Sequence, residues 1–368
     1  MLISIPDHSL ILKAAMKIVK TVLTTLALAG FFSVPAQALV ILQYHHVDST
    51  TPAVTSIDPA MFEQHMQLLE QQGKEIIDLK NAIQTLDQGD ELPLNAVAIT
   101  FDDAWLSIYD NAFPALKKRA WPFTVFVNTQ AVDEQHSKVM SWEQLAELQQ
   151  HGGLIANHGV SHPYLLEKPA ELSWDEWLTN EVLAAEKRIE NKLGVSHKML
   201  AYPYGEFNLA ITDWVREQGF IAFGQQSGPV GKDSNHQALP RFPASGVYAN
   251  PQTLKTKLNT LAFPHQQDLL VEPLLNENNP PALTLTVTSD DLYRSQVQCY
   301  ASAEGAIPTE VVASRNDQQI QVLTINTRAN KAITAGRGRY NCTAPSKQHK
   351  GWFYWYSQVW INTSVSNR

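Results

Sequence analysis

The stretch Ala96-Val-Ala-Ile-Thr-Phe-Asp-Asp103 decides the fold class of this chain. Its apolar run, 96–101, is too short for a helix and predicts a buried β-strand, and two carboxylates follow where that strand ends. The run Leu39–Tyr44 has the same form and is followed by His45 and His46. Buried strands that end in polar side chains are typical of parallel barrels, in which functional sites form at the carboxyl ends of the strands.

Strands and helices alternate along the chain on both sides of this stretch. Apolar runs predict further strands at 123–127, 154–156, 199–202, 220–223 and 238–242. Helical spacing and capping residues predict helices at 59–72, 108–119, 141–150, 173–194, 208–218 and 251–261. The repetition covers residues 39–263 and predicts an α/β fold in which a parallel sheet closes into a barrel.

The pattern changes after Phe263. Residues 264–281 are polar and contain prolines, which predicts a linker. Beyond it, 282–368 carries runs with a period of two, which predicts a small, sandwich-like all-β accessory domain. Aromatic residues gather at 352–360, where they either fill the core of this domain or stack on sugar rings.

The composition and the N-terminus favour an exported protein. Residues 1–38 resemble a signal peptide, with an apolar run and then Ala36-Gln37-Ala38; Met16 suits the start better than Met1. An uncleaved anchor is the alternative, but we expect no stable membrane insertion after cleavage and a periplasmic or secreted protein. A net charge of −8 and the lack of basic runs argue against nucleic acid as a partner.

The only two cysteines fit the same compartment. Cys299 and Cys342 both lie in the C-terminal region, and no pair of histidines lies near them. In an oxidising compartment they are expected to form a disulfide.

His158 and His162 are four residues apart and can reach one metal ion from a single turn of chain. Gly159 and Pro163 favour a loop over a helix between them. With Asp103 they would give a set of two histidines and one carboxylate, which leaves positions open for water and substrate. A divalent ion held this way acidifies its water and polarises a carbonyl oxygen. The alternative is a pair of surface or hydrogen-bonded histidines.

Asp102 and Asp103 are adjacent, and successive side chains of a regular strand point to opposite faces. The strand must therefore end there if both carboxylates serve one site. One could then bind the metal while the other removes a proton from water. Helix capping by Asp-Asp-Ala-Trp is the alternative.

Three segments together carry a family resemblance: Thr100-Phe-Asp-Asp103, His158-Gly-Val-Ser-His162 and Ala201-Tyr-Pro-Tyr-Gly205. Over residues 39–245 the chain resembles the polysaccharide deacetylases with a NodB-homology domain, carbohydrate esterase family four. The resemblance implies a distorted (β/α)7-type barrel that holds a divalent ion, most often Zn²⁺. It also implies the role of each matching residue: Asp102 the base, Asp103, His158 and His162 the metal ligands, and the Tyr204 backbone N–H the donor to the oxyanion.

The chain departs from the family pattern at three places. Gly159 replaces the usual Ser or Thr, and Ala201 stands where many members have an arginine that orients the catalytic Asp. No Leu-x-x-His segment near 238–263 supplies the usual catalytic histidine. His45 is our candidate for the general acid, with Arg241 as the alternative; His45 could equally be a hydrogen-bonded core histidine.

The expected function is the metal-dependent hydrolysis of N-acetyl groups. The substrate would be an N-acetylated polysaccharide that contains N-acetylglucosamine, because Gln43-Tyr-His-His-Val47 resembles family members that act on poly-N-acetylglucosamine or cell-wall glycans. Two alternatives stay open. One is a non-catalytic, metal-containing glycan-binding protein, and the other is a metal-dependent amidase with a small non-sugar substrate.

Overall fold

The computed structural model describes residues 38–265 and 269–366. The predicted signal peptide, apart from its last residue, lies outside these ranges. Within them, no helix combines the length and the hydropathy that a membrane-crossing segment requires.

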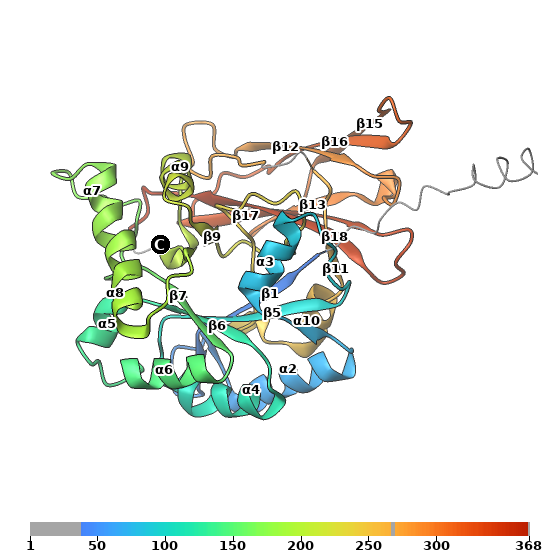
Figure 1. Cartoon of the computed structure of the whole chain (residues 1–368). Coiled ribbons are helices and arrows are strands. Elements are labelled where there is room, and N and C mark those ends of the chain that lie inside the picture. The colour runs from blue at the N-terminus through green and yellow to red at the C-terminus, as the bar shows by residue number, and fades with distance from the viewer. Residues whose placement is uncertain (1–37, 266–268, 367–368) are drawn as a thin grey trace, which may run out of the picture. The chain divides into compact units, whose positions relative to one another are not determined.

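A parallel sheet forms the barrel, as predicted (Figure 1). Along the sheet path the strands are, in order, β10 (Phe242–Pro243), β1 (Val40–Tyr44), β5 (Ala96–Asp102), β6 (Phe123–Val127), β7 (Gly153–Asn157), β8 (Met199–Ala201) and β9 (Ile221–Phe223). The two-residue strand β4 (Glu75–Ile76) also pairs with β5. A parallel bridge between Phe223 and Leu239 brings the segment before β10 against β9, so the far edge of the sheet curves back toward its start. The fold is a distorted (β/α)7-type barrel.

Helices follow the strands, and the sequence predicted all of them except those at 79–87 and 129–133. They are α2 (Pro59–Gln71), α3 (Leu79–Asp87), α4 (Phe113–Arg119), α5 (Thr129–Asp133), α6 (Trp142–Gln150), α7 (Trp174–Leu178), α8 (Ala184–Leu193), α9 (Leu209–Glu217) and α10 (Pro251–Lys257). Two π-helical turns, Ile108–Ala112 and Thr179–Leu183, lie within the predicted helices 108–119 and 173–194. Ser141 and Ser173 form the predicted capping boxes of α6 and α7.

Two predicted elements need correction. The helix expected over 251–261 ends at Lys257, and β11 (Thr260–Ala262) follows as a strand. The strand expected over 238–242 is reduced to β10, preceded by the bridge at Leu239.

The barrel strands have two buried faces. Outward-facing residues such as Leu42, Ile99 and Val125 pack beneath α2, α4 and α6, which lie together on one side of the strands (Figure 1). Inward-facing residues such as Ile41 and Ala98 form a separate apolar cluster. The inward series continues toward the carboxyl ends of the strands as polar residues, and this places the site described below.

The C-terminal region is all-β, as predicted, and has two sheets. The first has the order β11, β18 (Phe353–Ile361), β17 (Arg337–Pro345), β13 (Gln298–Ala301) and β14 (Gly305–Ile307). The second is antiparallel, with the order β12 (Ala282–Thr288), β16 (Gln321–Arg328) and β15 (Thr309–Arg315). Because β11 pairs with β18, the strand that ends the barrel segment belongs to a C-terminal sheet. The domain boundary at 263 stays a prediction.

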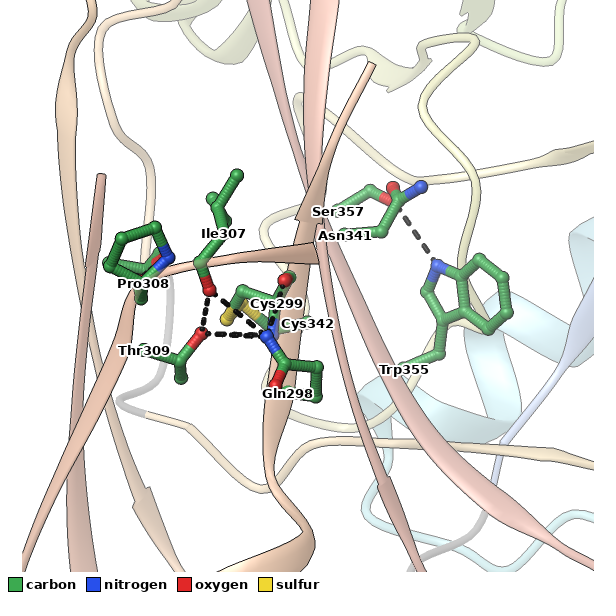
Figure 2. The surroundings of a disulfide bond; sticks show 10 residues. Gln298, Cys299, Ile307, Pro308, Thr309, Asn341, Cys342, Trp355 and Ser357 are labelled. Carbon is green, nitrogen blue, oxygen red and sulfur yellow. Dashed lines mark hydrogen bonds between the residues drawn. A yellow bond between two sulfur atoms is a disulfide. The ribbon is translucent and has the colours of Figure 1, made fainter. Parts of the chain in front are cut away.

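The predicted disulfide joins two neighbouring strands of the first sheet. Cys299 of β13 and Cys342 of β17 are register partners, and their sulfur atoms are bonded (Figure 2). Both residues are buried within the apolar cluster of this region. Tyr354 and Trp360 lie in the same cluster, which favours a structural role for these two members of the aromatic group.

Candidate active site

Three side chains converge in a geometry that suits a metal ion. Asp103 follows directly after β5, and His158 and His162 lie in the loop after β7. The Oδ1 atom of Asp103 is 3.6 Å from His158 Nε2 and 3.5 Å from His162 Nε2. One ligand atom from each residue lies within 4.8 Å of the other two. The sequence-predicted ligand set therefore comes together in space.

Neighbouring groups bond to the other polar atoms of Asp103 and His158, so the atoms that face the cluster stay available for a metal. His158 Nδ1 lies 2.7 Å from the Ala201 carbonyl oxygen, which can only accept, so Nδ1 carries the proton and Nε2 has a free lone pair. The Trp105 indole N–H donates to Asp103 Oδ2 at 2.9 Å, which leaves Oδ1 for a metal. Burial, together with neighbouring His158, lowers the pKa of His162 to about 4, so its imidazole is neutral at physiological pH. Two imidazoles and one carboxylate fit Zn²⁺.

The loop that carries the two histidines has its own supports. Gly159 has a φ of +83°, which favours glycine there, and its N–H donates to Asn157 Oδ1 at 2.8 Å. Ser161 donates through both its N–H and its hydroxyl to the Glu181 carboxylate, each at 3.0 Å. These bonds hold a loop in the place where the sequence favoured a loop over a helix.

Asp102 is fully buried and faces the inside of the barrel. Arg241 donates to both of its oxygens, at 2.6 and 2.8 Å, and Gln43 Nε2 donates to Oδ2 at 2.6 Å. Burial alone would raise the pKa of Asp102, but the Arg241 guanidinium together with neighbouring His158 and His45 outweighs burial and holds that pKa well below its usual range. The carboxylate is therefore ionised. Its neighbour Asp103 has a φ of +63°, so the chain turns out of the strand between the two carboxylates.

His45 lies beside Asp102 at the end of β1. Its Nε2 is 3.9 Å from Asp102 Oδ2, and its side chain is 18% exposed. The next residue, His46, is buried and stacks on the Trp105 ring at a centroid distance of 4.2 Å. Burial lowers the pKa of His46. Of the two histidines, His45 is the one that faces both Asp102 and solvent.

Tyr204 presents an unpaired backbone donor. It has a φ of +59°, a conformation that costs a non-glycine residue about 1–3 kcal/mol. Among the residues that the structure describes, no acceptor pairs with the Tyr204 N–H. Its ring stacks on Tyr164 at 4.0 Å and meets the edge of His162 at 4.5 Å between centroids. The N–H therefore belongs to a residue that touches the ligand cluster.

A hollow opens next to the ligand cluster. It has a volume of about 480 Å³ and extends from Asp103 and Trp105 to the segment 128–139 and to Ser161. Polar side chains, among them Gln130 and Glu134, form much of its wall. Such a space can accommodate a group larger than an acetyl.

The family model for polysaccharide deacetylases matches residues 89–223. Over this segment the chain is similar to the polysaccharide deacetylase family. The matched segment contains Asp102, Asp103, both histidines of the cluster and Tyr204, whereas His45 and Arg241 lie outside it.

Relatives within the family are moderately similar. The protein YxkH of Bacillus subtilis (strain 168) is 26% identical over 208 residues, which cover 56% of this chain and 71% of YxkH. A poly-beta-1,6-N-acetyl-D-glucosamine N-deacetylase of Staphylococcus aureus (strain MSSA476) is 27% identical over 199 residues, covering 51% and 67%. The solved structure of IcaB from Ammonifex degensii superposes with a TM-score of 0.54 at 26% identity, covering 61% of this chain and 98% of IcaB.

Several supporting residues of this site are not evident from sequence. Ala201 stands in place of the expected arginine, and Arg241, from a distant segment, binds the Asp102 carboxylate instead. Fully buried and bonded to Asp102, Arg241 is not suited to act as an acid, because its guanidinium does not lose a proton near neutral pH. The sequence predicted no supporting role for Gln43, Trp105 or Glu181, since single polar residues near strand ends carry no spacing signal.

Proposed function

We propose that this chain hydrolyses N-acetyl groups of a polysaccharide that contains N-acetylglucosamine. The observation that carries the proposal is an ionised, buried Asp102 next to an Asp-His-His cluster, with an unpaired backbone N–H at Tyr204. Acetamide hydrolysis needs a base for water, stabilisation of an oxyanion and an acid for the leaving amine. The described residues offer a candidate for each of these three tasks.

A divalent ion would be held by Asp103, His158 and His162, and Zn²⁺ fits this donor set best. When bound, the ion supplies Lewis-acid polarisation of the acetyl carbonyl and lowers the pKa of water. The second carboxylate oxygen of Asp103 is bonded to Trp105 and Nδ1 of His158 to the Ala201 carbonyl, which orients these two ligands beside Asp102.

The other residues would handle the proton transfers and the oxyanion. Asp102 would take a proton from the attacking water, held in place by the bidentate Arg241 guanidinium. The Tyr204 N–H would donate to the oxyanion of the tetrahedral intermediate. His45 would then protonate the departing amine, since it lies 3.9 Å from Asp102 and retains access to solvent.

The substrate class follows from the relatives and from the site. A relative named as a poly-beta-1,6-N-acetyl-D-glucosamine N-deacetylase makes a β-1,6-linked N-acetylglucosamine polymer the first substrate to test. The hollow of about 480 Å³ beside Asp103 gives room for sugar residues next to the acetyl group. The disulfide suits an oxidising compartment, which supports the proposal that the protein is exported to the periplasm or secreted.

The direct test is acetate release from β-1,6-linked N-acetylglucosamine oligomers by the full chain and by two variants. Asp102→Asn and His45→Gln should each lower kcat by about 10²–10⁴-fold. Asp213→Asn, on an exposed face of α9, and His236→Gln, whose ring pairs with Asp87, are the matched controls. Because Asp102→Asn leaves Arg241 without its partner, the thermal midpoint of each variant is measured alongside. Full activity in a folded His45→Gln variant would remove the proposed acid, and zinc binding without acetate release by the wild type would favour a glycan-binding protein.

A further inference from the structure

Strand β17 of the C-terminal region presents alternate side chains to the barrel. Its even-numbered residues, such as Tyr340 and Cys342, are buried in the apolar cluster of that region. Two of its odd-numbered residues bond to barrel residues instead. Arg337 donates to the Tyr204 carbonyl oxygen, and Arg339 donates to the Tyr248 hydroxyl, both at 2.7 Å. One face of β17 therefore reaches barrel loops.

Arg337 makes three contacts with the segment 203–206. Its Nη1 donates to the Tyr204 carbonyl, its Nε lies 3.8 Å from Oε1 of the fully buried Glu206, and its guanidinium carbon is 5.8 Å from the centre of the Tyr204 ring. These contacts involve the backbone, the ring and the second residue after Tyr204. The guanidinium is thus held against the turn by several contacts and does not depend on a single one.

The turn needs external support because its backbone is strained. The strained residue is Tyr204, with a φ of +59°; Gly205 adopts its φ of +70° without strain, and a Cβ there would come within 2.7 Å of the Gln225 side chain. If Tyr204 relaxed to an extended conformation, the peptide planes on both sides of its Cα would rotate. Its N–H and its carbonyl would then point in new directions. A charge-assisted hydrogen bond to the carbonyl opposes that rotation.

We infer that Arg337 is a positioning residue for the oxyanion donor, and that the C-terminal β region thereby completes the active site of the barrel. The inference rests on the proposed function, because it assigns Arg337 to the Tyr204 N–H of that mechanism. Arg337 acts through the turn and does not touch the reacting atoms.

The competing role for Arg337 is direct binding of the polymer, because its side chain is 34% exposed. Two substrates separate the roles. A small acetyl ester such as p-nitrophenyl acetate needs the oxyanion donor but no polymer contact, whereas a β-1,6-linked N-acetylglucosamine oligomer needs both. A positioning residue lowers kcat on both substrates, and a polymer contact raises KM on the oligomer alone.

The experiment compares the full-length wild type with Arg337→Gln, Arg337→Lys and the control Arg339→Gln, all loaded with zinc. The control removes an arginine from the same face of the same strand. Arg339 bonds to Tyr248, which is far in sequence from the residues of the ligand cluster. For Arg337→Gln we expect kcat to fall by about 10-fold to 100-fold on both substrates, less than the loss of a whole oxyanion donor, with KM and zinc affinity unchanged. Arg337→Lys should restore part of kcat, and Arg339→Gln should match the wild type.

Each remaining outcome overturns a definite statement. Wild-type kcat in Arg337→Gln, or a change confined to KM on the oligomer, would overturn the inference while the proposed function stands. If kcat fell equally in Arg337→Gln and Arg339→Gln, the cause would be a general loss of contact between β17 and the barrel, and the inference would also be overturned. No acetate from either substrate with the zinc-loaded wild type would overturn the proposed function itself. Thermal midpoints show whether Arg337→Gln is folded. If it is not, the kcat of Arg337→Lys on the two substrates tests the inference instead.

Discussion

At the scale of single residues, the site depends on a buried charge that is matched inside the protein. Asp102 has no exposure, and Arg241 and Gln43 take both of its oxygens. Removing one partner of such a pair leaves the other charge unpaired at a cost of about 3–5 kcal/mol. Arg241 therefore contributes to stability and to orientation together, and a substitution there mixes the two effects.

Trp105 offers a cleaner test of how the metal ligands are supported. In Trp105→Phe the ring that stacks on His46 remains, but the indole N–H that binds Asp103 Oδ2 is lost. We expect the zinc Kd to rise about 10-fold to 100-fold, the usual effect of losing a group that orients a metal ligand. Competition against a chromophoric chelator measures it without reference to activity.

The matched control for this variant is Trp142→Phe. The indole N–H of Trp142 also donates to a carboxylate, that of Asp133. This bond is exposed, and Trp142 is the first residue of α6 and not part of the ligand cluster. Equal zinc affinity in Trp105→Phe and Trp142→Phe would show that the indole of Trp105 does not support Asp103.

The sequence predicts the ligand residues of this site better than the residues that hold the site in place. Asp103, His158 and His162 stand in short segments with recognisable spacing, so their meeting could be predicted. Arg241 pairs with a residue 139 positions away, and nothing in its immediate sequence marks it. Such pairing depends on the inward direction of the chain before β10, which only the folded barrel defines.

At the scale of elements, helix α2 is tied to strand β1 through a buried histidine. His65 Nε2 lies 2.7 Å from the Ala249 carbonyl, so this nitrogen carries the proton, and Nδ1 lies 3.0 Å from the Tyr44 hydroxyl and accepts from it. The neutral imidazole satisfies both partners. A second proton would turn Nδ1 into a donor facing the hydroxyl, in a site without solvent exposure.

This arrangement predicts a pH-dependent stability. Burial lowers the pKa of His65 to about 4 in the folded protein, below its unfolded value of about 6.5. Between these values the unfolded chain binds more protons, so stability is complete above pH 6.5 and falls as the pH drops toward 4, by at most about 1.4 kcal/mol per pH unit. Urea unfolding of metal-free protein across this range measures the slope.

The variant that isolates this histidine is His65→Gln. Its amide retains one donor and one acceptor but does not titrate, so the slope between pH 4 and 6.5 should decrease relative to the wild type. His136→Gln, on the surface, should keep the wild-type slope. Identical slopes in all three proteins would mean that His65 does not remain neutral in the folded state.

Local signals predict elements well until a distant strand competes. Leu254, Leu258 and Leu261 have helical spacing, in keeping with the helix predicted over 251–261. The chain leaves the helix after Lys257 because Thr260–Ala262 pairs with Phe353–Trp355, nearly a hundred residues away. Strand β17 carries a weak sequence signal, since glycine and alanine occupy two of its buried positions, where a sequence pattern looks for large apolar residues.

At the scale of the whole chain, the barrel and the C-terminal region share buried residues within 36–368, which clusters as one compact unit. Val359 and Ile361 of β18 belong to the same apolar cluster as Leu200 and Tyr202 of the barrel. Strand β11 adds backbone pairing, and Arg337 adds a polar contact. The fold class could be predicted from the sequence, but this integration could not, because it depends on pairings between distant segments.

The disulfide gives a prediction at this scale. It closes a loop with a sequence separation of 43 residues, which corresponds to about 4 kcal/mol of stabilisation from the restricted unfolded chain. The double variant Cys299→Ser/Cys342→Ser should lose about that amount in guanidinium unfolding under oxidising conditions. The wild type under reducing conditions should match it. An unchanged unfolding midpoint in both experiments would mean that the disulfide adds no stability.

We propose that the Asp-His-His cluster holds a divalent ion on which deacetylation depends. The measurement that tests it most directly is acetate release from a β-1,6-linked N-acetylglucosamine oligomer by the full chain, first stripped of metal and then reloaded with zinc. We predict no release from the stripped protein, recovery on reloading, and no recovery in His162→Asn. Release that persists without metal, or zinc-loaded wild type that releases no acetate, would contradict the account.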